Sequence, residues 1–251
     1  MRVLYAGDGP IGGAANYVLG VLNFLKADWH HVPPSRSLPI RLLQSRPYDA
    51  IVLSDFPCHR TSDAAQRLIA SQVLQGTGLL MVGGWASFSG AHGGWRGSLV
   101  ERLLPVRCRA ADDRVHCPAG ALLLPHQFHP ILGANSFHQP PAICGVNAVR
   151  PTPSSITVLS ARRIVSQVGA ATHVRVSLHS RAYPVLVIDR DPRKRIAAFA
   201  TDLAPHWCGG LVDWGSRRLT LPVSRGLRVE VGDRYVHFVS SLLRWLAGGR
   251  G

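Results

Sequence analysis

The hydrophobic positions in the first part of the chain form short unbroken runs that alternate with stretches of helical spacing. The runs are residues 2–6, 48–55 and 79–82, and residues 28–32 are a further candidate for a short strand. Apolar runs of this length, bounded by glycine or an acid, are typical of strands buried on both faces. Between them, residues 14–26 and 62–75 carry apolar side chains at helical spacing. The alternation predicts a mainly parallel sheet with helices on both faces, which makes a three-layer α/β arrangement.

The second half of the chain has a weaker pattern. Prolines are frequent over residues 106–155, which we interpret as an irregular excursion of loops and short strands on the same domain. Two clearer strands, 184–188 and 195–201, are separated by a short turn and predict an antiparallel hairpin. We therefore expect one domain over residues 1–251. The remaining expected elements are a helix at 97–104, short strands at 158–162 and 174–178, a glycine-rich loop with short strand-like pieces at 208–231 and a helix at 233–247.

Charge and cysteine content change this picture little. The net charge is +14, but only Lys26 and Lys194 among the 28 basic residues are lysines, and the arginines are scattered. This indicates a compositional bias more than a nucleic-acid surface, which needs basic residues clustered on one face. No apolar run approaches the roughly 20 residues that span a bilayer, and no signal peptide is evident. We expect a cytoplasmic protein with no membrane partner.

Five cysteines at wide spacing predict free thiols, without a disulfide framework or a zinc site. Nothing in the sequence indicates a cofactor or a bound metal.

Candidate site residues follow the predicted strands. In an open parallel sheet, ligands bind at the carboxyl ends of the strands, so residues there are expected to line one crevice for a small polar ligand. The glycine pair Gly83–Gly84, which follows the predicted strand 79–82, could offer backbone N–H groups to an anion or a carbonyl oxygen. The predicted ligand-binding residues are Asp8, Asp55, Gly83, Gly84, Trp85, Ser87, Asp202 and Trp207.

Other roles for these residues stay open. The three acids and His206 could instead hold a divalent cation. The acids could also have structural roles, in which they cap helices or accept hydrogen bonds from loop amides. Ser87 is more simply a hydroxyl that orders its loop, and His206 could pack between Trp207 and Trp214.

Five segments together resemble the glutamine amidotransferase-like group, a branch of the class I glutamine amidotransferase fold that is related to the ThuA-like proteins. They are residues 5–22, 48–57, 76–90, 195–207 and 209–215. The resemblance covers nearly the whole chain in order. It implies a flavodoxin-like fold.

The resemblance also implies a test of activity. Class I amidotransferases place a nucleophilic cysteine at the turn after the strand that corresponds to residues 79–82, and a histidine after a late strand activates it. Here Gly83 and Gly84 stand at that turn, whereas His206 does follow a late strand. The resemblance therefore implies a family member without the cysteine nucleophile.

Two alternatives remain. In the first, the protein hydrolyses an amide with a displaced thiol, Cys208 or Cys58, and with His206 as the base. In the second, it is a non-enzymatic assembly module that forms a homo-oligomer through an aromatic end made of Trp207, Trp214 and Trp245.

Overall fold

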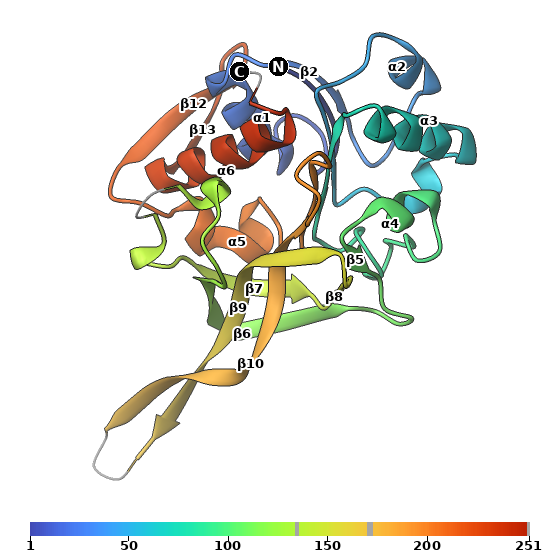
Figure 1. Ribbon diagram of the computed structural model, residues 1–251. Coiled ribbons are helices and arrows are strands. Elements are labelled where there is room, and N and C mark those ends of the chain that lie inside the picture. The colour runs from blue at the N-terminus through green and yellow to red at the C-terminus, as the bar shows by residue number, and fades with distance from the viewer. Residues whose placement is uncertain (134–135, 170–172, 250–251) are drawn as a thin grey trace.

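A nine-stranded sheet forms the centre of the computed structural model, which describes residues 1–133, 136–169 and 173–249 (Figure 1). Its strand order is β2-β1-β3-β4-β11-β10-β9-β6-β7. The first five strands in that order run parallel, and each later neighbour is antiparallel. The parallel strands are β1 (Arg2–Gly7), β2 (Asp28–Val32), β3 (Ala50–Ser54), β4 (Gly78–Val82) and β11 (Ile196–Phe199).

Strands β1, β3, β4 and β11 are short and almost entirely buried, as their apolar runs predicted, whereas the edge strand β2 is mostly half-buried. Their register aligns Gly7 with Ser54, Ser54 with Val82, and Val82 with Phe199. The residues that follow these four strands therefore leave the sheet at one edge and at one level. This alignment positions the candidate site.

The antiparallel half of the sheet departs from the sequence prediction. Its strands are β6 (Arg114–Pro125), β7 (Ala142–Asn147), β9 (Ser155–Val168) and β10 (Val174–Asp189). The predicted proline-rich excursion at 106–155 thus contains two strands of the main sheet. Its prolines lie at strand ends, at a register shift between β6 and β7, at the start of a 3-10 helix or in loops. The predicted strands 174–178 and 184–188 are both parts of β10. The predicted hairpin is confirmed, since Leu186 pairs with Phe199 in antiparallel register.

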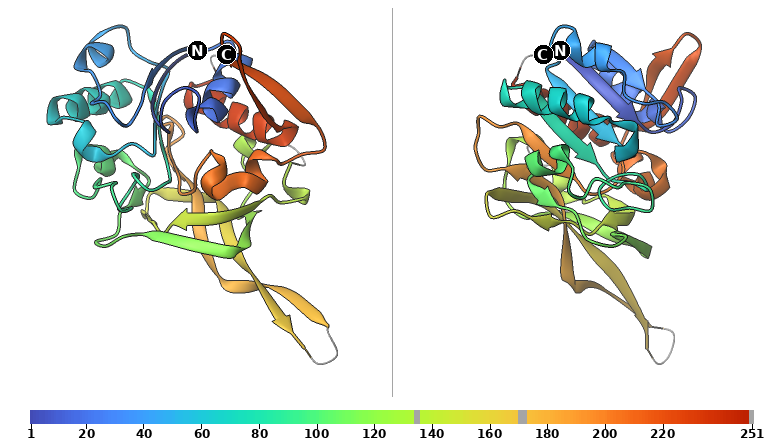
Figure 2. Two further views of the ribbon diagram at one scale, coloured as in Figure 1. Left: turned by 180° about the vertical axis from the view of Figure 1, so that it is seen from behind. Right: turned by 90° about the vertical axis from the view of Figure 1, so that its right-hand side faces the viewer.

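The ends of β9 and β10 project beyond the rest of the molecule as a two-stranded arm (Figures 1 and 2). Polar and charged residues interrupt the apolar pattern there, which is why the pattern alone gave only short strands.

Successive residues of each buried strand point to opposite faces, so the sheet has two separate cores. On one face, Tyr5, Val52 and Leu80 pack with helices α1 (Ala15–Phe24), α5 (Pro205–Val212) and α6 (Asp233–Leu246). On the other face, Leu4, Leu53 and Met81 pack with α2 (Ile40–Gln44), α3 (Asp63–Leu74) and α4 (Leu99–Leu103). The predicted three-layer α/β fold is confirmed.

Smaller elements complete the molecule. Residues 208–231, predicted as a glycine-rich loop with short strand-like pieces, contain a hairpin of two such strands and, as a departure from the prediction, the end of α5. The remaining elements are β5 (Val106–Arg107) paired with β8 (Arg150–Pro151), the hairpin β12 (Arg218–Ser224) and β13 (Leu227–Gly232), and the 3-10 helices η1 (Cys58–Arg60), η2 (Pro130–Leu132) and η3 (Ser136–His138). Within the described residues, every helix is too short or too polar to cross a membrane.

Helix α6 ends directly against the start of β4, and this contact needs a glycine. A Cβ on Gly78 would lie 2.2 Å from the backbone oxygen of Leu246. We predict that Gly78→Ala lowers the free energy of unfolding by about 1–3 kcal/mol, because the backbone must shift to admit the methyl group. Urea denaturation measures this change.

The matched control is Gly209→Ala in α5, where an added Cβ meets nothing within 4 Å. This variant is expected to stay within about 1 kcal/mol of the wild type, since alanine favours a helix. Equal losses in the two variants would contradict the assigned contact.

Candidate functional site

Two aspartates turn the chain aside where β1 and β3 end. Asp8 has φ 55° and Asp55 has φ 48°, which is the left-handed region that few residues other than glycine adopt. Aspartate tolerates it because its short polar side chain can bond locally. The backbone N–H of Asp8 donates to the carbonyl of Ser54 at 3.0 Å, so the two turns are joined.

The carboxyl group of Asp8 is buried under the end of the sheet, where the hydroxyl of Tyr5 donates to its Oδ2. Burial raises the pKa of Asp8 to about 7. Asp202 is also buried and lies near enough for mutual repulsion, and burial raises its pKa well above the ordinary value. Its Oδ1 accepts a hydrogen bond from the Ala204 N–H at 2.9 Å.

Asp55 organises the loop after β4. Its carboxylate accepts a hydrogen bond from the Ala86 N–H, and its own N–H donates to Ser87 Oγ at 3.0 Å. Burial raises the pKa of Asp55. Ser87 is 1% exposed, so its hydroxyl orders the loop and does not face a ligand. Asp55 therefore has the structural role that the sequence analysis gave as an alternative, in which an acid accepts hydrogen bonds from loop amides.

The glycine pair after β4 is tied to the protein itself. The Gly83 N–H donates to the carbonyls of Phe199 at 2.7 Å and Thr201 at 3.0 Å. The Gly84 N–H donates to Asn147 Oδ1 at 2.9 Å. The expectation that these two N–H groups face an anion or a carbonyl oxygen is therefore wrong, because both already have protein acceptors.

Asn147 and Asp113 are site residues that the sequence analysis missed. Besides its bond to the Gly84 N–H, the Asn147 amide donates to the Gly84 carbonyl at 3.1 Å and to Asp113 Oδ1 at 2.7 Å. Asp113 in turn accepts from the Ser89 N–H at 2.9 Å. Both residues come from the antiparallel half of the sheet, and no motif marks them.

Helix α5 carries the late-strand residues. The His206 side chain is 71% exposed, and its Nδ1 lies 3.8 Å from Asp202 Oδ2. Trp207 is 4% exposed and packs flat on Gly145, where an added Cβ would lie 2.5 Å from the indole. The alternative in which His206 packs between Trp207 and Trp214 is therefore wrong, because the imidazole points into solvent.

The two candidate thiols are not activated. Cys208 is fully buried, its Sγ lies 3.1 Å from the Thr201 hydroxyl, and burial raises its pKa well above the ordinary value. Cys58 is half-buried in η1, where Gln66 Nε2 donates to its Sγ at 3.7 Å, and burial raises its pKa also. All five cysteines are free thiols, as predicted.

His206 stands between two surface hollows at this edge of the sheet. A hollow of about 400 Å³ is lined by Trp85, His116, Pro118, Cys144, His206 and Trp207. A second hollow, of about 580 Å³, lies between His206, the glycine loop after β1 and the hairpin of β12 and β13. Trp85 is 49% exposed, and the Arg114 guanidinium lies 4.3 Å from its ring centre.

The structure does not support two of the other interpretations. Among the described residues, no three His, Cys, Asp or Glu side chains are placed to hold a metal ion, so the acids and His206 do not form a cation site. The proposed aromatic end is not a surface, because Trp207 and Trp214 are both buried. The predicted homo-oligomer stays a prediction, but it cannot form through Trp207 and Trp214, because both are buried.

Comparisons with known proteins agree on the fold. A family model described as "Putative glutamine amidotransferase" matches residues 14–221. Two cytoplasmic proteins from Salmonella typhimurium, the second from strain LT2, have similar structures. Each has a TM-score of 0.63 and covers 82% of this chain and 90% of its own, at 23% and 24% identity.

A "putative gmp synthase subunit a protein" from Thermoplasma acidophilum has a TM-score of 0.51 and 11% identity over 100% of this chain and 96% of its own. At these identities the likeness concerns the fold alone. The comparison with curated proteins gives no match.

The raised pKa of Asp8 predicts a pH-dependent stability. The folded protein keeps the proton up to about pH 7, whereas the unfolded chain releases it near the ordinary value of 3.8. Stability should therefore fall as pH rises between these values. We predict that Asp8→Asn, which stays neutral, loses less unfolding free energy than the wild type between pH 5 and pH 8, by an amount on the order of 1 kcal/mol or more. Urea denaturation at the two pH values measures the difference.

The matched control is Asp112→Asn, since Asp112 is exposed and its hydrogen bonds to Arg114 lower its pKa. That variant is expected to keep the wild-type slope over the same pH range. A slope unchanged in Asp8→Asn would mean that Asp8 is ionised in the folded protein.

Proposed function

Since the chain belongs to the glutamine amidotransferase-like family whose model covers residues 14–221, we propose that it is a member that binds a small polar ligand at the carboxyl edge of its sheet and does not hydrolyse glutamine. The observation that carries this proposal is the closed turn after β4. In place of a cysteine, the turn has two glycines whose N–H groups are both bonded within the protein.

The geometry of the turn supports the loss of the nucleophile. A Cβ on Gly84 would lie 2.5 Å from Asp55 Oδ1, and a Cβ on Gly83 would lie 2.5 Å from Asn147 Oδ1. Gly84 also has φ 148°, which side chains rarely adopt. A cysteine at either position would need the loop and the Asn147 amide to move. A single substitution of glycine by cysteine would therefore not restore the nucleophile turn.

The state of the thiols argues against hydrolysis by a displaced cysteine. The thiolate is the nucleophilic form, and it requires a lowered pKa or an adjacent base. Burial moves the pKa of both Cys208 and Cys58 the other way, and Cys208 is fully covered. An amide substrate could not reach its sulfur without opening α5.

Of the two hollows beside His206, the one lined by Trp85 and His116 is the best candidate for the ligand-binding site. It combines the half-exposed indole of Trp85 and the small exposed part of Trp207 with the polar edges of His206 and His116. Aromatic faces with a few polar groups suit a compact polar molecule with some C–H surface, such as a sugar or an amino-acid derivative. Its volume of about 400 Å³ is within the range of small-molecule sites.

The first test is glutamine hydrolysis under reducing conditions. We expect no glutamate release from the wild type above that of Cys208→Ser and Cys58→Ser, measured by amino-acid analysis. Activity in the wild type that Cys208→Ser abolishes and Cys58→Ser retains would overturn the proposal in favour of a thiol hydrolase.

The second test concerns the binding surface. We expect Trp85→Ala to weaken binding of any monosaccharide or amino acid that binds the wild type, by roughly tenfold, because the ring contributes stacking as well as contact area. Isothermal titration calorimetry over a panel of these compounds measures the effect. The control is Phe128→Ala, an 81% exposed aromatic residue outside the hollow. A panel without binding, or equal effects in both variants, would contradict the assigned hollow.

A further inference from the structure

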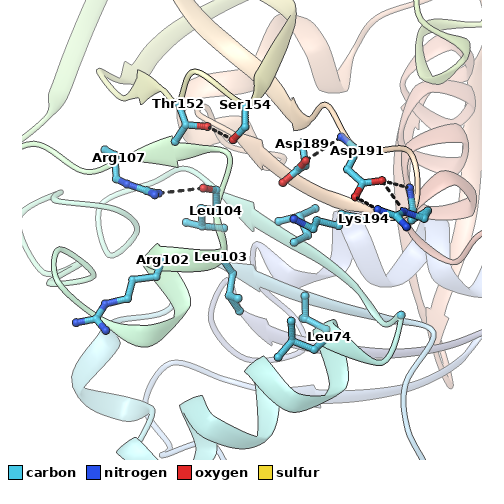
Figure 3. Close-up of a pocket in the computed structure, with 14 residues that line it drawn as sticks. Leu74, Arg102, Leu103, Leu104, Arg107, Thr152, Ser154, Asp189, Asp191 and Lys194 are labelled. Atoms are coloured by element: carbon cyan, nitrogen blue, oxygen red, sulfur yellow. Dashed lines mark hydrogen bonds and ion pairs between the residues drawn. The ribbon is translucent and has the colours of Figure 1, made fainter.

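A separate cavity, distinct from the two hollows beside His206, lies at the opposite edge of the sheet. Figure 3 shows the residues that line it. Its volume is about 390 Å³. The cavity is enclosed by the carboxyl ends of α3 and α4, by the loop around Thr152 and Ser154, and by the turn before β11. Gly76 and Ile196 place it at the amino ends of β4 and β11. Five residues of β4 at about 3.3 Å each separate the two edges by roughly 16 Å, so the cavity does not belong to the site at the carboxyl edge.

One side of this cavity is apolar. Val73, Leu104 and Ile196 are buried core residues that reach its wall. Leu74 stands at the cavity and is 79% exposed, which is unusual for a residue of its size. In Figure 3, the leucines at the ends of α3 and α4 face the turn that carries Asp191 and Lys194.

The rest of the lining is cationic. Four basic side chains and two carboxylates line the cavity, and the carboxylates are already engaged. Arg193 bonds both carboxylate oxygens of Asp191, at 3.1 and 3.0 Å, and Asp189 accepts a hydrogen bond from the Asp191 N–H at 2.9 Å. The excess positive charge comes from Arg102, Arg107 and Lys194.

Among the described residues, none of these three cations forms a close ion pair with a carboxylate, and the carboxylate of Asp191 acts on the ammonium group of Lys194 only through its charge. Arg107 donates only to backbone carbonyls, at 3.2 to 3.3 Å. In the part of the chain that the structure describes, neither Arg102 nor Lys194 forms an ion pair. Basic side chains that gather beside an exposed apolar wall are suited to a ligand with both characters.

We propose that this cavity is a second binding site, which takes a small organic anion with an apolar body and a single carboxylate, sulfonate or phosphate head. The apolar body contacts Leu74, Leu104 and Ile196, and the head binds the ammonium group of Lys194. The proposal is independent of the function assigned to the opposite edge.

The lysine content of the chain gives a direct test. Only Lys26 and Lys194 occur in the sequence, and Lys26 lies at the carboxyl end of α1, outside the residues that line the cavity. Reductive methylation with an isotopically labelled methyl donor therefore produces NMR signals from two lysines and the α-amino group, and it keeps their charge. Lys26→Gln and Lys194→Gln assign the two lysine signals.

The probe is anilinonaphthalene sulfonate, an anion with an aromatic body, and its neutral counterpart is phenylnaphthylamine. We expect the sulfonate to shift the Lys194 signal in a saturable manner and to leave the Lys26 signal in place. The neutral compound is expected to bind at least several-fold more weakly. Equal shifts at both lysines, or equal affinity for the neutral compound, would overturn the proposal.

Variants test the same site through affinity. Lys194→Gln is expected to weaken sulfonate binding about three- to tenfold, as for a solvent-accessible charge contact. Lys26→Gln is the matched control, because it removes an exposed lysine elsewhere and the same net charge. Fluorescence titration of each folded variant measures the dissociation constant. Equal affinities in Lys194→Gln and Lys26→Gln would mean that the anion binds through net charge alone.

Discussion

The structure depends on the return of the last strand of the sheet to the carboxyl end of the parallel half. Strand β7 is an edge strand in the sheet order, yet the Asn147 N–H donates to the carbonyl of Ala200 at 2.8 Å, and the Thr201 hydroxyl donates to the carbonyl of Gly145 at 2.7 Å. The antiparallel half therefore curls back over the carboxyl ends of β4 and β11. Helix α5 packs between these parts, with Trp207 on Gly145.

This closure determines the chemistry of the candidate site. The Asn147 side chain takes up the hydrogen-bonding capacity of Gly84, which an ancestral nucleophile turn would have offered to a substrate. Cys208, Asp8 and Asp202 are buried nearby, and burial raises the pKa of each group. A buried carboxyl is stable when it keeps its proton, which favours a neutral, structural role for these acids. The groups left for a ligand are His206, Trp85 and their neighbours in the hollow.

The two edges of the sheet differ in how their charges are arranged. At the carboxyl edge, acids are buried and their charge is suppressed. At the amino edge, basic side chains from α4 and from the turn before β11 gather beside exposed Leu74 with few acids to neutralise them. The net charge of +14 is spread along the sequence, but the fold concentrates part of it at this cavity.

The sequence by itself determined most of the parallel half of the fold. Unbroken apolar runs and helical stripes depend only on burial, which is local in sequence, so strands β1, β3 and β4 and helices α1 and α3 follow from the pattern. The edge strand β2 carries no such run, and the pattern gave β11 only as an arm of a hairpin. The pattern also placed Asp8, Asp55, Gly83 and Asp202 after strands, and the register brings them to one edge. Only the tertiary structure decided what those residues do. The curl of the antiparallel half brings Asn147 to Gly84 across 63 positions of the chain, and a contact between residues so far apart leaves no signal in local periodicity. That contact closes the turn after β4.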